Sequence, residues 1–296
     1  MSGEYAVLEG ATAVVTTVDA RAFAIIGGVS THVSPVLRAV ADMVSGEIFT
    51  NRPPDVEVNS DVFSASGIKL GLGSSAAVCA AACGLLFEHA GLPIDGNRDR
   101  ILELASMAHF AAQGSRGSGA DVAASVLGGT ILFCARGARP MVSEPGICAK
   151  VVWTGSASST VGLLDRVRDL ERSDRSGYRR RMDDLVDLAG ALEEAYSLGE
   201  VKRIVDLTGE YGRAMKRLGD DAGTPIVTQE HQRVMTIAAA TGGAAKPSGA
   251  GGGDCAVAVF AQSQEADLFE DRCAKDGLQI LNLRLHVEGL RAEPSP

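Results

Sequence analysis

The sequence predicts an α+β fold with two domains, and three observations support this prediction. The chain has 296 residues, of which 46% are hydrophobic, so it can bury one large core or two medium-sized cores. Segments rich in β-branched residues alternate with segments rich in alanine and leucine, which indicates interleaved strands and helices. After a crossing at 136–146 that contains proline and glycine, the composition changes, because most of the charge of the second half lies within 158–218. We therefore place one domain at 1–148 and the second at 149–296.

The first domain is expected to contain strands at its beginning and end, with helices between them. A β-branched region with partial alternation predicts a strand pair or one long strand at Thr12–Ile26. A run rich in alanine and leucine predicts a helix that begins at Ser74 and ends at Gly91. The remaining elements are predicted in this order: a helix at 98–112, a short helix at Asp121–Leu127 and a strand at Thr130–Cys134.

The second domain is expected to form a further α+β layer. Its charged helices within 158–218 present exposed faces, as charged residues at helical spacing do. The other predicted elements are a strand at Lys150–Thr154, a helix at 228–241, a glycine-rich loop at Lys246–Asp254, a strand at Cys255–Phe260, a helix at 263–275 and a strand at Gln279–Val287.

The charge of the chain excludes some classes of partner. A formal net charge of -9 argues against nonspecific binding to nucleic acid or to a membrane surface, since both need a large cationic field. The longest run without charge or strong polarity, Ala76–Phe87, is much shorter than the roughly 20 residues of a membrane helix. Because Glu4 precedes any apolar run, the N-terminus does not resemble a secretion signal. We expect a cytoplasmic monomer or homodimer, and an anionic substrate would need a local basic pocket.

The strongest local signal is the run at 69–77, in which two glycines precede a predicted helix. Gly71 and Gly73 allow backbone N–H groups to approach an anion, and the helix directs its positive end toward it. Ser74 and Ser75 are candidates to donate to a phosphate or to ligate Mg²⁺. The run is neither a Walker loop, since no Gly-Lys-Ser/Thr closes it, nor a dinucleotide fingerprint, since the third glycine does not match. The alternative interpretation is an ordinary helix capped by serine.

Two further glycine motifs point to the same ligand. Pro247–Asp254 runs directly into a predicted strand, so we expect it to close over a ligand, although a flexible linker is the alternative. Gly117–Asp121 offers a carboxylate on a tight turn, a position suited to a general base near a substrate hydroxyl. The alternative for Asp121 is a helix cap.

Three ordered motifs resemble the signatures of the GHMP small-molecule kinases: Gly3–Gly10, Gly71–Ala76 and Ser248–Asp254. Together they extend over nearly the whole chain. The resemblance implies an N-terminal ATP-binding domain similar to domain 2 of ribosomal protein S5 and a ferredoxin-like C-terminal domain. It also implies that the ATP phosphates lie at the 71–76 loop and that the 248–254 loop closes over the acceptor.

Within that family, three segments are most similar to the phosphomevalonate kinases of the mevalonate pathway: Gln113–Ala124, Trp153–Thr160 and Lys246–Cys255. The resemblance implies transfer of a phosphoryl group from ATP, with Mg²⁺, to a phosphate oxygen of 5-phosphomevalonate on the route to isoprenoids. Mevalonate kinases and mevalonate diphosphate decarboxylases are the nearest alternatives. A catalytically impaired homologue that binds nucleotide is a further alternative.

The resemblance also implies roles for individual residues. Asp121 is the catalytic candidate and is expected to orient groups or Mg²⁺, because a phosphate acceptor has little proton to lose at neutral pH. Ser75 is the metal candidate. The predicted nucleotide-binding residues are Lys69, Gly71, Leu72, Gly73, Ser74, Ser75 and Ala76. The predicted acceptor-binding residues are Arg116, Ser118, Gly119, Lys246, Ser248, Gly249, Ala250 and Gly251. For the three basic residues, an ordinary solvated role is the alternative.

This sequence departs from the family pattern in two places. Family members carry a strand with a lysine before the first motif, whereas this chain starts at Met1. We expect that the start has been assigned too late, with a shortened or a catalytically impaired chain as alternatives. Where mevalonate kinase-like members place a Mg²⁺-binding glutamate, the corresponding helix offers His109, a poor ligand for a hard cation. His32 and His109 are also candidates for the acceptor site, with a structural role as the alternative.

Overall fold

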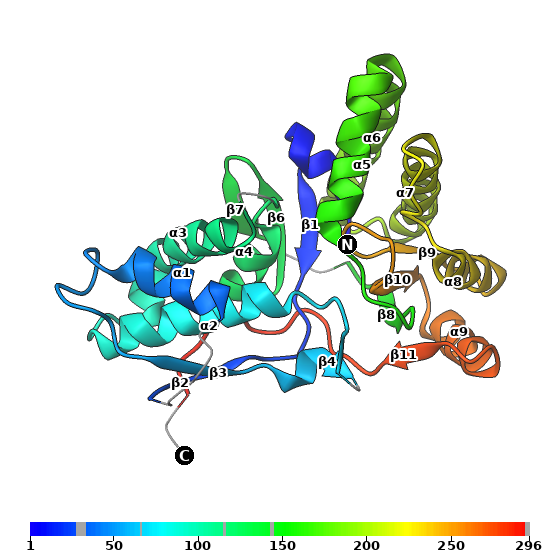
Figure 1. Cartoon of the computed structure of the whole chain (residues 1–296). Coiled ribbons are helices and arrows are strands. Elements are labelled where there is room, and N and C mark those ends of the chain that lie inside the picture. Colours follow the sequence, from blue (N-terminus) through cyan, green and yellow to red (C-terminus); the bar gives the residue numbers. More distant parts are fainter. Residues whose placement is uncertain (28–33, 66, 115–116, 143–144, 294–296) are drawn as a thin grey trace. The chain divides into compact units, whose positions relative to one another are not determined.

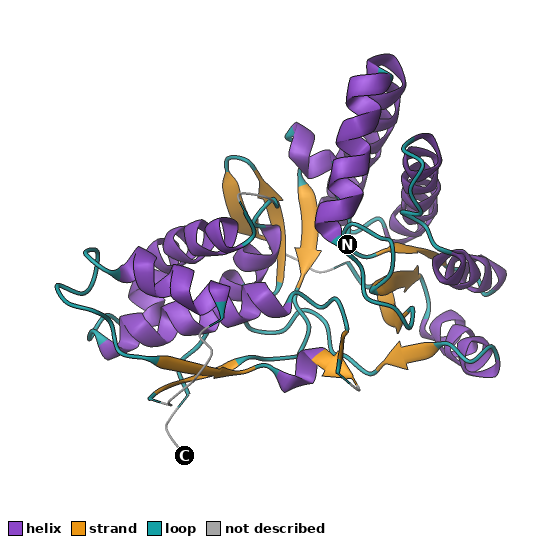
Figure 2. Ribbon diagram, viewed as in Figure 1, coloured by secondary structure: helices purple, strands orange, loops and turns teal. Residues whose placement is uncertain are grey.

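Figures 1 and 2 show the computed structural model of the chain, which describes residues 1–27, 34–65, 67–114, 117–142 and 145–293. The chain forms two compact units. The first unit comprises Met1–Val15, Gly67–Gly71 and Leu132–Arg284, and the second comprises Thr16–Ser66, Leu72–Ile131 and Leu285–Pro296. Each unit combines several separate stretches of the sequence. The predicted domain boundary after residue 148 therefore stays a prediction.

The first unit contains an antiparallel sheet with the strand order β11, β8, β10, β9. These strands are β8 (Cys148–Trp153), β9 (Ala244–Pro247), β10 (Cys255–Phe260) and β11 (Gln279–Leu281). In β10, Cys255 pairs with Trp153 of β8, and Ala256 pairs with Pro247 of β9. The register therefore places the end of β9 beside the start of β10, and the glycine-rich loop connects them.

Strand β10 is buried along its whole length because helices cover both of its faces. The helices of this unit are α5 (Thr160–Ser173), α6 (Arg175–Leu198), α7 (Val201–Asp221), α8 (Gln229–Ala240) and α9 (Ser263–Lys275). Ala258 and Phe260 pack with apolar residues of α8 and α9. Val257 and Val259 pack with Val205 of α7. Burial on both faces explains the uninterrupted apolar run in the sequence of β10.

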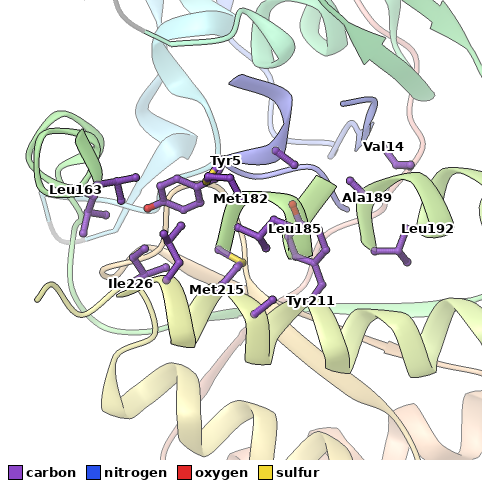
Figure 3. Packing of buried hydrophobic residues seen from close by; sticks show 14 of the residues in the cluster. Tyr5, Val14, Leu163, Met182, Leu185, Ala189, Leu192, Tyr211, Met215 and Ile226 are labelled. Carbon is purple, nitrogen blue, oxygen red and sulfur yellow. The ribbon is translucent and has the colours of Figure 1, made fainter. Parts of the chain in front are cut away.

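Figure 3 shows a second apolar cluster of this unit, which attaches the N-terminal motif to the helices. Leu163 of α5, Leu185 of α6 and Met215 of α7 belong to the cluster together with Tyr5. Tyr211 of α7 is fully buried, and its hydroxyl group donates to the backbone carbonyl of Glu4 at 2.7 Å.

Short elements complete the first unit and lead into the second. They are the 3-10 helix η1 (Ala6–Glu9) and the strands β1 (Ala13–Thr16), β5 (Ile68–Lys69), β6 (Thr130–Cys134) and β7 (Gly137–Pro140). Strands β1, β6 and β7 form a sheet in that order, and the chain passes from one unit to the other within β1 and within β6.

The second unit is built around helices. Its elements are α1 (Pro35–Val44), α2 (Ser74–His89), α3 (Ile94–Ala112), α4 (Ala120–Leu127), the strands β2 (Phe23–Ile26), β3 (Val56–Asn59) and β4 (Ser64–Ala65), and the 3-10 helix η2 (Asp61–Phe63). Strands β2 and β3 pair in antiparallel fashion. Small residues let α2 approach α3 closely, so that the Cys79 thiol of α2 donates to the carbonyl of Ala105 at 3.1 Å.

The α+β prediction is confirmed, and several elements have the predicted bounds. The strands at Thr130–Cys134 and Cys255–Phe260 and the helix at 263–275 are found as predicted. The helix predicted at 98–112 begins earlier, at Ile94, where the Glu88 carboxylate accepts from the Ile94 N–H group at 2.7 Å. Among the described residues, no helix is both long and apolar enough to cross a membrane.

The prediction of a strand pair or one long strand at Thr12–Ile26 is wrong. The segment holds two strands, β1 and β2, which belong to different sheets. Between them the backbone turns to other partners: the Thr17 N–H group donates to the carbonyl of Gly129, and Val18 bridges to Leu285. These contacts come from residues far along the sequence, which local alternation does not reveal.

The strand predicted at Gln279–Val287 is too long, and β3, β4, β5, β7 and β9 were not predicted. Strand β11 ends at Leu281, and further along the segment His286 has a φ of 54°, a left-handed value that an extended strand does not accommodate. The segment predicted as a loop from Lys246 begins instead inside β9.

Candidate functional site

The predicted phosphate loop passes from the first unit into the second between Gly71 and Leu72. The candidate residues therefore form two groups, each described within its own unit. The group in the second unit lies at the starts of α2 and α4 and near the end of α3. The group in the first unit combines Lys69 and Gly71 with the segment after β8 and the glycine-rich loop.

Helix α2 begins without a side-chain cap. Gly73 is the N-cap residue, with a left-handed φ of 77°, and no side chain accepts from the first turn. Ser74 and Ser75 are therefore the first two helical residues, and the alternative of a serine cap is wrong. Among the described residues, no side chain accepts from the N–H groups at the start of α2, which is the condition for binding an anion at a helix N-terminus.

A buried histidine of α3 supports Ser75. The Ser75 Oγ atom lies 2.9 Å from Nε2 of His109, and the same nitrogen lies 3.0 Å from the side-chain nitrogen of Gln113. Only 3% of His109 is exposed. Since Nε2 has either one lone pair or one N–H group, the imidazole fixes the direction of the Ser75 hydroxyl.

Asp121 is the second residue of α4 and not its cap. The N-cap residue is Gly119, with a φ of 83°, so the alternative of a capping aspartate is wrong. Ser118 contributes to this turn, because its hydroxyl accepts from the Ala120 N–H group at 3.3 Å. The Asp121 Oδ2 atom lies 3.9 Å from Nε2 of His109, and 42% of the Asp121 side chain is exposed. The carboxylate is thus accessible and close to the imidazole that supports Ser75.

Ser75 and Asp121 fit a magnesium ion better than His109 does. Their oxygen atoms both lie near Nε2 of His109, at 2.9 and 3.9 Å. Mg²⁺ prefers oxygen ligands and is usually held by one or two carboxylates together with phosphates and water, whereas a ring nitrogen is a poorer ligand. In the described parts of the chain, no three His, Cys, Asp or Glu side chains are arranged to hold a metal. A cation held by Ser75 and Asp121 would keep positions for phosphate oxygens and water, as Mg²⁺ usually does.

In the first unit, Asp254 ends the glycine-rich loop in direct contact with Gly71. A Cβ atom added to Gly71 would lie 2.2 Å from the Cβ atom of Asp254. Asp254 has a left-handed φ of 55°, and its Oδ1 atom accepts from the Ser158 N–H group at 3.0 Å. Burial raises the pKa of the Asp254 carboxyl, and the Ser158 N–H group and the charge of Lys69 oppose this rise. Asp254 therefore joins the phosphate loop, the segment after β8 and the glycine-rich loop.

Defined hydrogen bonds hold the glycine-rich loop. The Tyr5 hydroxyl donates to the carbonyl of Ala250 at 2.6 Å, and the Ser158 hydroxyl donates to the carbonyl of Gly251. The Gly252 N–H group donates to a backbone carbonyl that precedes α8 at 2.9 Å. The alternative of a flexible linker is therefore wrong.

Other predicted residues lie at the margins of these groups. The Ser248 N–H group donates to the carbonyl of Cys255 at 2.8 Å, and Gly249 is exposed with a φ of 72°. Ala76 is fully buried in α2, and Leu72 is half-buried. Ala76 can therefore contribute only its backbone to a ligand.

Lys246 does not face a ligand surface, which corrects its predicted role in acceptor binding. Its side chain is fully buried and forms an ion pair with Glu4. The ammonium group also donates to the carbonyl of Pro247 at 3.0 Å and lies 5.6 Å from the centre of the Tyr211 ring. The physical reason is that residue 246 belongs to the buried strand β9, where its charge needs an internal partner.

Two predicted residues lie outside the described part of the chain. These are Arg116, an acceptor-binding candidate, and His32. Lys69 is described and exposed, at the end of β5.

Family models match both halves of the chain. The model described as "GHMP kinases N terminal domain" matches residues 33–129, and the model described as "GHMP kinases C terminal" matches residues 204–277. A mevalonate kinase from Pyrococcus horikoshii is 30% identical over 257 residues, which cover 81% of this chain and 70% of the relative. The chain belongs to the GHMP kinases.

Another relative carries a different name within the family. A phosphomevalonate kinase from Streptomyces sp. (strain CL190) is 30% identical over 251 residues, which cover 76% of this chain. The chain spans 66% of that relative's length.

Solved structures confirm the two-domain GHMP kinase fold. The phosphomevalonate kinase of Streptococcus pneumoniae, solved in complex with phosphomevalonate and AMPPNP, has a TM-score of 0.76 against this chain. It is 18% identical, and the match covers 96% of each chain. At this identity the likeness concerns the fold alone.

The sequence motifs of this GHMP kinase predicted which segments form the candidate site, but not the contacts that their residues make. Tyr5 lies in the first motif and Ser158 in the Trp153–Thr160 segment, yet neither was predicted to hold the glycine-rich loop. Gln113, whose side chain contacts His109, was not among the predicted site residues. His231 of α8, which is fully buried with Nε2 3.3 Å from the carbonyl of Cys255, has no signal in the sequence.

Proposed function

We propose that this GHMP kinase transfers the γ-phosphoryl group of ATP to a phosphate oxygen of 5-phosphomevalonate, giving 5-diphosphomevalonate and ADP. The observation that carries the proposal is the uncapped start of α2, where the Ser75 hydroxyl and the Asp121 carboxylate both lie near His109. Such transfer depends mainly on positioning and on charge stabilisation. The name and identity of the Streptomyces relative support the choice of acceptor.

In this proposal the start of α2 binds the nucleotide phosphates. The N–H groups of the residues from Gly73 to Ala76 donate to phosphate oxygens, and the helix dipole favours their negative charge. Gly73 permits this approach because it has a left-handed φ and no side chain. Lys69 supplies a positive charge from the exposed end of β5.

Ser75 and Asp121 would hold Mg²⁺, with His109 fixing the hydroxyl of Ser75. When bound, the cation neutralises negative charge on the phosphates. Asp121 orients the acceptor or the cation and does not need to remove a proton, because a phosphate acceptor is already largely deprotonated at neutral pH.

The acceptor is assigned to the glycine-rich loop, with Ser248, Gly249, Ala250 and Gly251, and to the turn that holds Ser118 and Gly119. Both segments contain glycines with a left-handed φ, at Gly119, Gly249 and Gly251, so no side chain blocks the approach of a ligand to the backbone there. Arg116 is retained as an acceptor-binding residue in this proposal.

A second acceptor has a specific observation in its favour, because the Pyrococcus relative is named a mevalonate kinase. Mevalonate lacks the terminal phosphate, so a site built for phosphomevalonate leaves donors unpaired when mevalonate binds. We therefore expect kcat/KM to be at least about tenfold higher for phosphomevalonate.

The test measures ADP release with ATP and Mg²⁺ in the presence of each acceptor, and CO₂ release with mevalonate diphosphate. The proposal predicts ADP release that depends on phosphomevalonate. A preference for mevalonate would assign the chain to the other kinase, and CO₂ release from mevalonate diphosphate would identify a decarboxylase. ATP binding without turnover on any acceptor would identify a nucleotide-binding homologue.

A further inference from the structure

We propose that Tyr5 positions the Ala250–Gly251 peptide so that the Gly251 N–H group donates to an anionic oxygen of the acceptor. The inference deepens the proposed function and rests on it for the identity of the acceptor. Tyr5 acts through the peptide, so it is a positioning residue and does not itself touch the acceptor.

The orientation of the peptide follows from one hydrogen bond. The Tyr5 hydroxyl donates to the carbonyl of Ala250 at 2.6 Å. The peptide is trans, and in a trans peptide the C=O and N–H groups point to opposite sides. The Gly251 N–H group therefore points away from the Tyr5 hydroxyl, and rotating this peptide would break the Tyr5 hydrogen bond.

The Gly251 N–H group has no hydrogen-bond partner among the described residues, although Gly251 is buried. No hydrogen bond between described residues uses this group, whereas the N–H group of the next residue, Gly252, donates at 2.9 Å. Buried N–H groups nearly always have a hydrogen-bond partner. We therefore assign a ligand oxygen or a water molecule as the partner of the Gly251 N–H group.

The surrounding residues hold Tyr5 in an unfavourable conformation. Tyr5 has a φ of 63° and a ψ of -51°, outside the usual regions for a residue with a side chain, and only 4% of it is exposed. The Tyr211 hydroxyl donates to the carbonyl of Glu4, which fixes the peptide that precedes Tyr5. Strain of this kind persists where the fold imposes it and is frequent at functional sites. The strained residue here is the one that orients Ala250.

An anionic oxygen could come from the acceptor or from the nucleotide. The proposed function assigns the nucleotide phosphates to the N–H groups at the start of α2. The loop around Gly251 presents neighbouring left-handed positions at Gly249, Gly251 and Gly252, and such turns form small concave anion sites. We assign this donor to the phosphate or carboxylate of the acceptor.

The binding test uses the full chain with two single substitutions. Tyr5→Phe removes the hydroxyl and keeps the ring. Tyr196→Phe of α6 is the matched control, because Tyr196 is 2% exposed and its hydroxyl has no partner among the described residues. We expect Tyr5→Phe to raise the Kd and the KM of phosphomevalonate about fivefold, with kcat and the Kd of ADP changed less than twofold. Tyr196→Phe should leave all four values unchanged.

A spectroscopic measurement follows the Gly251 N–H group directly. Labelling alanine with ¹³C at the carbonyl and glycine with ¹⁵N selects the amides of glycines that follow alanine, namely Gly91, Gly190, Gly223 and Gly251. On adding phosphomevalonate to the wild-type chain, we expect the Gly251 signal to move while the other three stay in place. This measurement holds even if Tyr5→Phe fails to fold.

An unmoved Gly251 signal at saturating phosphomevalonate overturns the proposal, since the N–H group then binds only water. An equal effect of the two tyrosine substitutions on KM would also overturn it, as would an effect of Tyr5→Phe on ADP alone. The failure of the proposed function is distinguishable: in that case the chain releases no ADP with phosphomevalonate, whatever the Gly251 signal does.

Discussion

Gly71 and Asp254 fit together only because residue 71 has no side chain. A Cβ atom on Gly71 would lie 2.2 Å from the Cβ atom and 2.4 Å from the Cγ atom of Asp254. Both residues have left-handed backbones, with φ values of 74° and 55°. The phosphate loop and the glycine-rich loop of this GHMP kinase are thus joined through one close contact within the first unit.

Replacing Gly71 by alanine should lower the free energy of unfolding by more than the cost of a left-handed backbone alone. We expect Gly71→Ala to lower the free energy of unfolding by about 2–4 kcal/mol, the sum of backbone strain and overpacking. Gly91→Ala is the control, because Gly91 has a φ of 77° and no atom within 4 Å of an added Cβ. That control should lose only about 1 kcal/mol. Urea unfolding measures the free energy of unfolding of each variant. Equal losses in Gly71→Ala and Gly91→Ala would show that Asp254 moves aside at no cost.

Removing the Ser75 hydroxyl should change the response of the enzyme to magnesium. If Ser75 is a ligand, Ser75→Ala raises the Mg²⁺ concentration needed for half-maximal turnover by about tenfold and lowers kcat. Ser106→Ala on α3 is the control, since its hydroxyl has no hydrogen bond within the described residues and the site does not use it. A Mg²⁺ titration of each variant measures the effect. An unchanged half-maximal concentration in Ser75→Ala would exclude Ser75 as a ligand.

The charge of Asp121 should matter for turnover and not for nucleotide affinity. Asp121→Asn keeps the shape of the side chain, so the Kd of ATP should stay within about twofold while kcat falls by about 10²-fold or more. Asp95→Asn is the control, because Asp95 is an exposed acid in the first turn of α3. If Asp121→Asn and Asp95→Asn turn over equally fast, Asp121 is structural.

Buried His231 should make the fold sensitive to mild acid. Burial lowers the pKa of His231, and its Nδ1 atom accepts from the Thr228 N–H group at 3.2 Å, a bond that the protonated ring could not form. The unfolded chain binds a proton below about pH 6.5, so the contribution of His231 to stability is present above that pH and is lost as the pH falls.

The unfolding free energy should therefore decline between pH 6.5 and 5.5 more steeply in the wild type than in His231→Gln, by up to about 1.4 kcal/mol per pH unit. His89→Gln, at the exposed end of α2, should keep the wild-type slope. Parallel slopes for the wild type and His231→Gln would mean that the buried ring does not resist protonation.

The elements that the sequence predicted accurately have strong local signals. Strand β10 is a continuous apolar run, and α9 begins at a capping box between Gln262 and Glu265. Strand β9 was missed because Ala244–Pro247 has no β-branched residue, and its pairing with β10 is set by tertiary structure.

The sequence predicted which segments belong to the candidate site, but it did not predict which residues of those segments contact one another. The glycine spacing marked the start of α2, since only glycine adopts the φ of Gly73 without cost. The partner of Lys246 could not be predicted, because Glu4 lies 242 positions earlier in the chain. The hydrogen bond from Tyr5 to Ala250 spans 245 positions, and the local sequence of neither segment predicts it.

The most direct test of the account is ³¹P NMR of the full chain incubated with ATP, Mg²⁺ and 5-phosphomevalonate. We expect the phosphomonoester signal of the acceptor to disappear while two coupled diphosphate signals of the product and the signals of ADP grow in equal amounts. Asp121→Asn should form both products at least about 10²-fold more slowly. A persistent phosphomonoester signal in the wild type, together with phosphorylation of mevalonate under the same conditions, would contradict the central claim.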